Sequence, residues 1–151
     1  GGGTAQRAVQ LCQSFFSDGE GNLELFYLSG LYLGRGMVCR SLSTDCGKTW
    51  SRPVTLLPSE TTFARFLEPT PGLLWVLWLY SGRTSRYLLE FSLDGGVSWQ
   101  TYAELEDDKT RRSCTLACGR PDGGEWPEWP AVYVPYLLWQ NGDAGIFCAH
   151  P

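Results

Sequence analysis

The sequence predicts an all-β chain, built from about three four-stranded antiparallel blades of an incomplete β-propeller ring. An eight-residue pattern occurs twice, 49 residues apart, a spacing typical of propeller blades. Tight turns are expected to be abundant, since the 151 residues include 18 Gly and 9 Pro, and 14% of the chain is aromatic. No stretch keeps the helical period of about 3.6 residues over three turns, so we expect little helix.

The repeated pattern is S-x-D-x-G-x-[S/T]-W, at residues 43–50 and 92–99, here called the first and second octapeptide turns. Its matched positions are Ser43, Asp45, Gly47, Thr49, Trp50, Ser92, Asp94, Gly96, Ser98 and Trp99. The Asp accepts hydrogen bonds from turn amides, the Gly permits positive φ, the hydroxyl adds a local bond and the Trp packs on the blade. The pattern therefore predicts a structural role that involves no chemistry.

Each octapeptide turn is expected to join the third and fourth strands of a blade. A glycine-containing turn and an apolar stretch precede it, at 18–30 and at 69–82. The predicted strands are 9–16, 23–28, 37–43 and 51–57 in the first unit and 61–67, 73–80, 86–92 and 100–105 in the second. The chain then forms a single partial domain, with blades at about 5–58, 59–108 and 109–151.

The third unit is expected to be incomplete. Its first strand is predicted at 113–118, and a Pro-rich insertion follows at 125–130. The similarity of 145–148 to 36–39 predicts that a third strand begins there. About two and a half blades cannot close a ring, and open blades leave strand edges unpaired. We therefore expect a piece of a longer protein, or a ring that copies of the chain close together.

The octapeptide turns resemble the Asp-box (BNR) repeat superfamily, whose best-known members are six-bladed sialidases. In that family the boxes lie on the outer rim, away from the catalytic face, so the resemblance implies architecture rather than activity. Segments at 58–76, 86–96 and 112–117 also resemble successive portions of sialidase blades. By the same resemblance, 146–151 is similar to the end of a second strand, which competes with the third-strand assignment above.

The resemblance implies one candidate catalytic residue, Glu60, which precedes a strand as does the sialidase glutamate that polarises a tyrosine nucleophile. Other parts of a sialidase site have no counterpart, among them the [Y/F]-R-I-P motif and the aspartate acid/base. Sialidases hold the carboxylate of sialic acid with three arginines, of which the first belongs to the [Y/F]-R-I-P motif, and Leu79 and Tyr80 stand where the resemblance places the second. A retaining glycosidase needs its nucleophile and its acid/base together, so we do not expect this chain alone to be an enzyme, and the parent protein's activity stays open.

Five further residues are candidate ligand contacts. Guanidinium groups pair with carboxylates, and aromatic rings in a Pro-rich loop can stack on sugars or on a protein partner. These candidates are Arg65, Arg83, Arg86, Trp126 and Trp129. The alternative for the arginines is an ordinary surface role, for the tryptophans packing on their own blade, and for Glu60 a solvated loop carboxylate.

Composition argues against several other classes. The net charge of −4 argues against nucleic acid as a partner, and the longest apolar run, 73–80, is too short to span a membrane. The 6 cysteines fit no zinc pattern and the only His is His150, so we expect no metal and no cofactor. Thiols and disulfides both fit the cysteine spacing. This leaves the compartment open, with an extracellular, cell-surface or virion-associated setting slightly favoured.

Three functions remain. The first is a non-catalytic propeller segment that binds a glycan, such as one containing sialic acid, or a protein. The second is a fragment of an active exo-sialidase, a glycoside hydrolase. The third is a purely structural half-propeller, completed by other copies, by a partner chain or by the remaining blades of the parent chain. The absent arginines and the aromatic loop favour the first.

Overall fold

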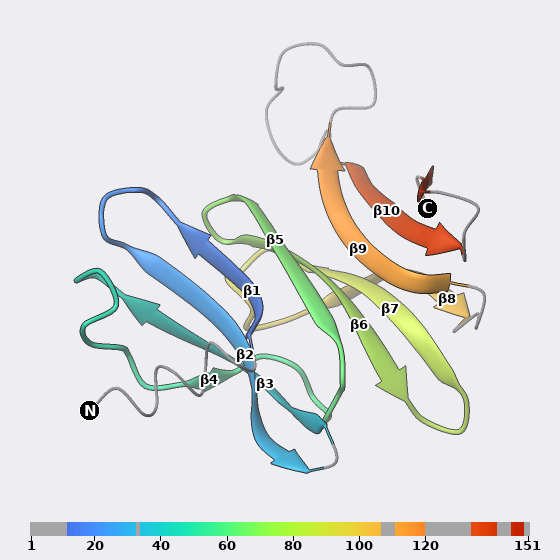
Figure 1. Cartoon of the computed structure of the whole chain (residues 1–151), viewed down its shortest axis with the longest axis horizontal. Helices are drawn as coiled ribbons and strands as arrows, with labels where there is room; N and C mark the ends of the chain where they lie inside the picture. The colour runs from blue at the N-terminus through green and yellow to red at the C-terminus, as the bar shows by residue number, and fades with distance from the viewer. Residues whose placement is uncertain (1–11, 33, 107–110, 120–133, 142–145, 150–151) are drawn as a thin grey trace. The chain divides into compact units, whose positions relative to one another are not determined.

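The computed structural model describes residues 12–32, 34–106, 111–119, 134–141 and 146–149. All regular elements among these residues are strands, so the predicted all-β class is confirmed for the described part of the chain (Figure 1). The strands are β1 (Cys12–Ser17), β2 (Leu23–Tyr32), β3 (Arg35–Ser43), β4 (Val54–Thr55), β5 (Ala64–Thr70), β6 (Leu73–Ser81), β7 (Ser85–Ser92), β8 (Gln100–Glu106), β9 (Arg111–Gly119), β10 (Val134–Asn141) and β11 (Ile146–Ala149).

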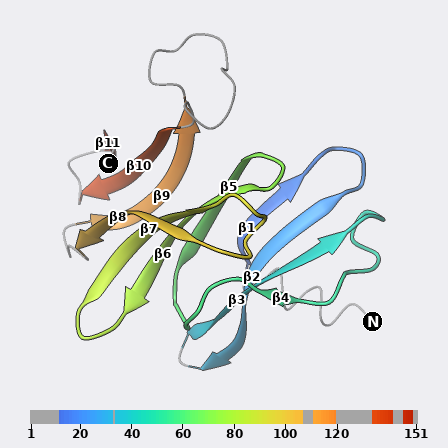
Figure 2. The same cartoon turned by 180° about the vertical axis from the view of Figure 1, so that it is seen from behind.

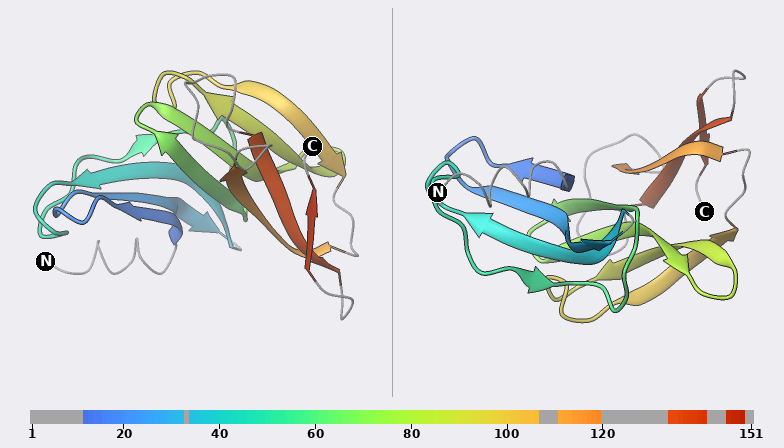
Figure 3. Two further views of the ribbon diagram at one scale, coloured as in Figure 1. Left: turned by 90° about the horizontal axis from the view of Figure 1, so that it is seen from above. Right: turned by 60° about the horizontal axis from the view of Figure 1, so that its bottom comes forward.

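The strands form three sheets. Two are four-stranded, with the orders β1-β2-β3-β4 and β5-β6-β7-β8, and one is three-stranded, with the order β11-β10-β9. Neighbours in each sheet are consecutive along the chain and antiparallel where their register is defined. Each sheet is therefore a simple meander of the kind predicted for the first two units. Figure 2 gives the reverse view, and Figure 3 shows the twist of the strands that is usual for β-sheets.

The chain divides into two compact units. The first unit comprises Gly1–Ala64 and Trp78–Ser81, and the second comprises Arg65–Leu77 and Gly82–Pro151. Each unit contains one octapeptide turn. The first turn joins β3 to β4, and the second joins β7 to β8, as the sequence predicts.

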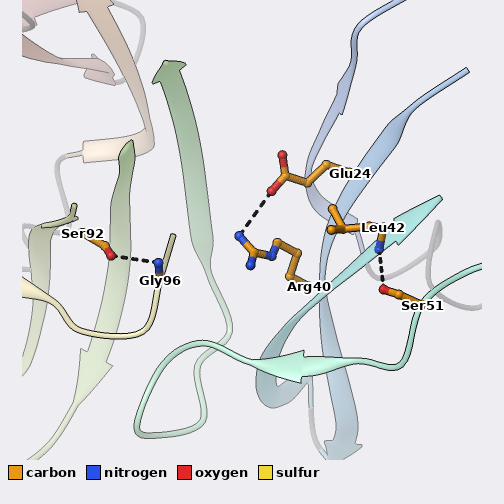
Figure 4. Close-up of polar contacts among 6 residues, drawn as sticks. All are labelled: Glu24, Arg40, Leu42, Ser51, Ser92 and Gly96. Atoms are coloured by element: carbon orange, nitrogen blue, oxygen red, sulfur yellow. Dashed lines mark hydrogen bonds and ion pairs between the residues drawn. The ribbon is translucent and has the colours of Figure 1, made fainter. Parts of the chain in front are cut away.

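The fourth strand of the first sheet is much shorter than predicted. Only Val54–Thr55 pair as β4, although a strand was expected over 51–57. The segment still follows β3, because the Ser51 amide donates to Leu42 O (2.8 Å) and Leu42 N donates to Ser51 Oγ (2.9 Å; Figure 4). A side chain thus replaces a backbone acceptor here, and Pro53 has no amide with which to extend the ladder.

Strand β5 begins three residues later than predicted, at Ala64 rather than Thr61. The Thr61 side chain occupies the backbone groups that would start the strand. Its hydroxyl donates to Phe63 O (2.9 Å) or Leu79 O (2.7 Å), and it accepts from Phe63 N (3.1 Å). Thr61 also pairs with Gly36 through two backbone hydrogen bonds of 2.9 and 3.0 Å.

The core of the two four-stranded sheets lies along their inner strands. In β6, six consecutive residues from Leu73 to Trp78 are buried. Because successive side chains of a strand point to opposite faces, β6 is covered on both faces rather than on one. Aromatic rings continue this packing across the sheet, where Trp75 meets Phe91 (5.1 Å between centroids) and Tyr102 (5.3 Å).

The third sheet confirms the strand expected at 113–118, which is β9. It also contains β10, which the sequence analysis does not predict. Because β11 is the third strand in this sheet, the segment at 146–149 follows the third-strand assignment rather than the second-strand one. The insertion at 125–130 lies outside the described residues. Among those that are described, no helix is long and apolar enough to cross a membrane.

Candidate functional site

The first octapeptide turn is held by its own side chains. The Ser43 hydroxyl donates to Asp45 Oδ1 (2.8 Å) and accepts from Gly47 N (2.9 Å). Asp45 in turn accepts from the Thr49 amide (2.9 Å) and from the Thr49 hydroxyl (2.6 Å). The Trp50 indole closes the turn by donating to Gly47 O (3.1 Å). All these bonds are internal to the turn, as its sequence predicts.

The second octapeptide turn repeats the bonds of the serine and the aspartate. Ser92 donates to Asp94 Oδ1 (2.7 Å) and accepts from Gly96 N (2.8 Å; Figure 4). Asp94 accepts from the Ser98 amide (2.9 Å) and the Ser98 hydroxyl (2.6 Å). The ring of Trp99 packs edge-on against Phe66 at 6.3 Å. All ten matched positions therefore take part in structural contacts, the two glycines through their backbone groups.

The sequence analysis missed one bond of this unit. The Cys46 amide donates to Gly21 O (3.0 Å), and the equivalent Gly95 amide donates to Gly72 O (2.9 Å). Gly21 and Gly72 belong to the turns that join the first and second strands of each sheet. Each octapeptide turn is thus tied to the neighbouring hairpin at the same end of its sheet. The sequence contains a signal for this bond, because the two glycines stand at corresponding positions in the two repeated units.

Hydrogen bonding stabilises the charged form of both turn carboxylates. The Thr49 hydroxyl, then the Thr49 amide and the Ser43 hydroxyl, lower the pKa of Asp45 from 3.8 to about 2. The corresponding bonds, with that of the Ser98 hydroxyl first, lower the pKa of Asp94 well below its ordinary value. A carboxylate held in its charged form by fixed local donors is a poor general acid, which agrees with a structural role.

Glu60 has an exposed side chain on a fixed segment of backbone. The next residue, Thr61, is fully buried and is bonded to Gly36, Phe63 and Leu79 as described above. The bond to Leu79 O brings the end of β6 against the segment that contains Glu60. At Gly36 itself a Cβ would lie 2.7 Å from Ser29 O, so glycine permits β2 and β3 to come close at the point where Thr61 pairs. The carboxylate is thus accessible, and its attachment point is rigid.

The three candidate arginines lie at one end of the second sheet. Arg65 is the second residue of β5, Arg83 lies in the turn between β6 and β7, and Arg86 is the second residue of β7. In an antiparallel meander the start of β5, the end of β6 and the start of β7 meet at the same end (Figure 1). The second octapeptide turn lies at the opposite end, so the fold separates it from the arginines.

These arginines differ in their surroundings. Residues 81–86 are all exposed, so Arg83 and Arg86 belong to an open hairpin, whereas Arg65 is half-buried. Arg86 is already paired, with its Nη1 3.4 Å from Oε2 of Glu104 on β8. The pair is exposed, with 44% and 52% of the two side chains accessible, so solvent weakens it strongly.

The remaining site predictions fall mainly outside the described residues. Trp126 and Trp129 lie there, as does His150. Within the described part, no group of three or more His, Cys, Asp or Glu residues is arranged to hold a metal. Cys39 and Cys46 are thiols rather than disulfides, and the Cys12 thiol donates to Ser14 O (3.3 Å).

No protein-family model, curated protein or solved structure matches the chain. The resemblance to the Asp-box repeats therefore rests on the octapeptide turns and the segments that accompany them in the sequence.

Proposed function

We propose that the chain is a segment of a sialidase-like β-propeller and acts as a non-catalytic module that binds a glycan or a protein. One observation supports the architecture above all others. Two four-stranded meanders each join their third and fourth strands by the same hydrogen-bonded octapeptide, and each ties this turn to the glycine of the preceding hairpin. Such a repeated unit is typical of propeller blades.

The burial of β6 gives a second argument for blades. A sheet with one solvated face alternates apolar and polar residues, whereas β6 has six consecutive buried residues. A propeller blade packs against a neighbour on each face, so its inner strands are apolar on both. The proposed architecture thus explains a pattern that an isolated sheet with one wet face does not.

The arginines at the end of the second sheet support the binding role. Guanidinium groups recognise carboxylates through charge-assisted hydrogen bonds, and Arg65, Arg83 and Arg86 lie at the end away from the structural turn. The chain as a whole is acidic, with a net charge of −4, so a local group of arginines is not a consequence of general basicity. A carboxylate-bearing glycan, such as a sialoside, or an acidic protein segment matches this chemistry.

The binding proposal is tested by titrating the chain with sialyllactose and with lactose, by calorimetry or NMR. We expect binding of sialyllactose only, weakened about 10-fold or more by Arg83→Gln or Arg65→Gln, because each removes one charge-assisted contact. Arg52→Gln is the matched control, since Arg52 is also exposed but lies between β3 and β4 of the first sheet. Equal weakening by all three variants contradicts a site at the end of the second sheet.

An active exo-sialidase fragment is the alternative function, and the setting of Glu60 favours it. An accessible carboxylate on a rigid backbone segment is what a catalytic or ligand-facing Glu requires. Release of a fluorogenic leaving group from a sialoside, lost in Glu60→Gln and kept in the exposed control Glu20→Gln, establishes this alternative. The absence of release by the unmodified chain and by its parent protein rejects it.

A structural half-propeller, completed by oligomerisation or by a partner chain, is the second alternative. Outer strands of both sheets bear exposed apolar side chains, with Phe15 on β1 50% exposed, Val54 on β4 52% and Tyr102 on β8 44%. Light scattering across a dilution series separates the cases. A closed oligomer that dissociates on dilution favours the structural role, and a monomer at every concentration contradicts assembly from copies.

A further inference from the structure

Within the described part of the chain, each four-stranded sheet has an ion pair between neighbouring strands, and these two pairs differ in their access to solvent. In the first sheet, Nη1 of Arg40 lies 3.5 Å from Oε1 of Glu24, and the two side chains are only 21% and 17% exposed (Figure 4). In the second sheet, the Arg86–Glu104 pair spans 3.4 Å with side chains that are 44% and 52% exposed. Glu24 and Arg40 are largely enclosed, whereas Arg86 and Glu104 can both be reached by a dissolved ligand.

Glu104 reaches Arg86 diagonally across the sheet. The strand register places Arg86 opposite Glu106 and places Glu104 opposite Leu88. Alternate residues of one strand share a face, so Glu104 and Glu106 lie on the same face of β8. Two carboxylates of β8 therefore lie near Arg86, Glu106 directly opposite and Glu104 diagonally across. The ion pair of 3.4 Å is with Glu104. Glu104 therefore opposes an anion at Arg86 in two ways. It already occupies the guanidinium, and its negative charge repels the anion.

We propose that Glu104 is a tethered competitor for the ligand carboxylate at Arg86, so that a carboxylate-bearing ligand binds the β6–β7 hairpin by displacing Glu104. This inference rests on the proposed binding function and specifies how its site is regulated. The exposed ion pair is weak enough to be displaced, because surface pairs contribute little and are screened by salt. The competing groups are both carboxylates, so removal of the Glu104 charge both removes the carboxylate that competes at Arg86 and removes its repulsion of the ligand.

Acetate, which is the carboxylate group alone, is the first probe, and the side-chain Nε–H signal of Arg86 is followed by NMR. The signal is assigned by its loss in Arg86→Lys. We expect Glu104→Gln to lower the acetate concentration at half-shift by about 2- to 5-fold, the range expected for an exposed pair. Glu106→Gln removes the same charge from the same strand but not the paired carboxylate, and we expect it to have less than half of this effect.

Two results overturn the inference. One is an equal effect of Glu104→Gln and Glu106→Gln, which indicates general electrostatics rather than displacement. The other is an Arg86 signal that acetate shifts in neither protein. Folding of each variant is checked by the amide spectrum, and Glu104→Asp, which keeps the charge on a shorter side chain, is expected to fall between the unmodified chain and Glu104→Gln.

A parallel titration with sialyllactose separates this inference from the proposed function. If acetate responds as expected and sialyllactose does not bind, the competitor role stands and the sialoside ligand is wrong. If sialyllactose binds and its affinity is the same in Arg86→Lys, Glu104→Gln and the unmodified chain, a binding function stands and the competitor role is wrong.

Discussion

The two octapeptide turns are built alike, and their hydrogen bonds are conserved even where the residues differ, as between Thr49 and Ser98. Corresponding hydrogen bonds agree within 0.1 Å, for example 2.9 and 2.8 Å from the glycine amide to the serine hydroxyl. The largest differences are in side chains that point away from this network. Thr44 and Lys48 in the first turn are replaced by Leu93 and Val97 in the second, which are 54% and 85% exposed. The comparison teaches that the turn is defined by its polar contacts, and that its outer surface is open to change.

Acid should weaken both turns, and this is the largest effect we expect. The pKa of each turn aspartate is lowered in the folded chain below the ordinary 3.8, to about 2 for Asp45. A lowered folded-state pKa means that the stabilisation is complete above 3.8 and is lost as the pH falls toward 2. Urea unfolding between about pH 5 and about pH 2 should therefore show a steep loss of stability.

The matched variant for the acid experiment is the double substitution Asp45→Asn with Asp94→Asn. It should be less stable than the unmodified chain at about pH 5, and its stability should depend less on pH over the same range. An unchanged pH dependence in this variant would assign the acid sensitivity to other carboxylates. Asp18 is the first of these, because its bond from the Asn22 side chain also lowers its pKa.

The serine positions give the next largest effect and separate the two turns. Ser92→Ala leaves the Gly96 amide without its acceptor in a buried site, whereas Ser43→Ala does so at a partly exposed one. A buried amide without a partner costs about 1–3 kcal/mol, so we expect a loss of about 2 kcal/mol for Ser92→Ala and about 1 kcal/mol for Ser43→Ala. Urea denaturation at neutral pH measures both, and equal losses would contradict the difference in burial.

The smallest effect is expected at the position after each aspartate. Cys46 has φ of 60° and Gly95 has φ of 71°, both in the left-handed region. A Cβ at Gly95 would meet no atom within 4 Å, so Gly95→Ala tests backbone strain alone, and we expect a loss of about 1 kcal/mol. Cys46→Gly should change stability by less than about 0.5 kcal/mol, because relief of strain is offset by the flexibility of glycine in the unfolded chain. A loss above about 1 kcal/mol would instead assign a packing role to Cys46 Sγ. This sulfur lies close to Gly21, where an added Cβ would be only 2.9 Å from it.

Strand positions in the first two units could largely be predicted from the sequence. The strands predicted at 73–80 and 86–92 correspond to β6 and β7, because the residue types within each segment and the turns beside it already indicate a strand. The limits of β4 and β5 could not be predicted, since they depend on bonds between distant residues, as between Ser51 and Leu42 or Thr61 and Leu79. A hydroxyl that replaces a backbone partner leaves no periodic signal.

The candidate site was less predictable than the strands. The sequence could propose Arg65, Arg83 and Arg86 by residue type, but their common location follows from the antiparallel order of β5, β6 and β7. The pairing of Arg86 with Glu104 follows from the register of β7 and β8. That register contains a shift between Leu89 and Glu90, which no sequence period indicates.

The continuous burial of β6 has a consequence for the unfolded chain. Its residues from Leu73 to Trp78 contain no charge and no proline, so once the sheet opens they form a segment that can pair with copies of itself. Pro71 stands just before the strand and Arg83 just after it, which are the residue types that limit such pairing at the ends of apolar segments. The strand that contributes most to the folded core is therefore also the strand whose exposure during synthesis or refolding must be brief.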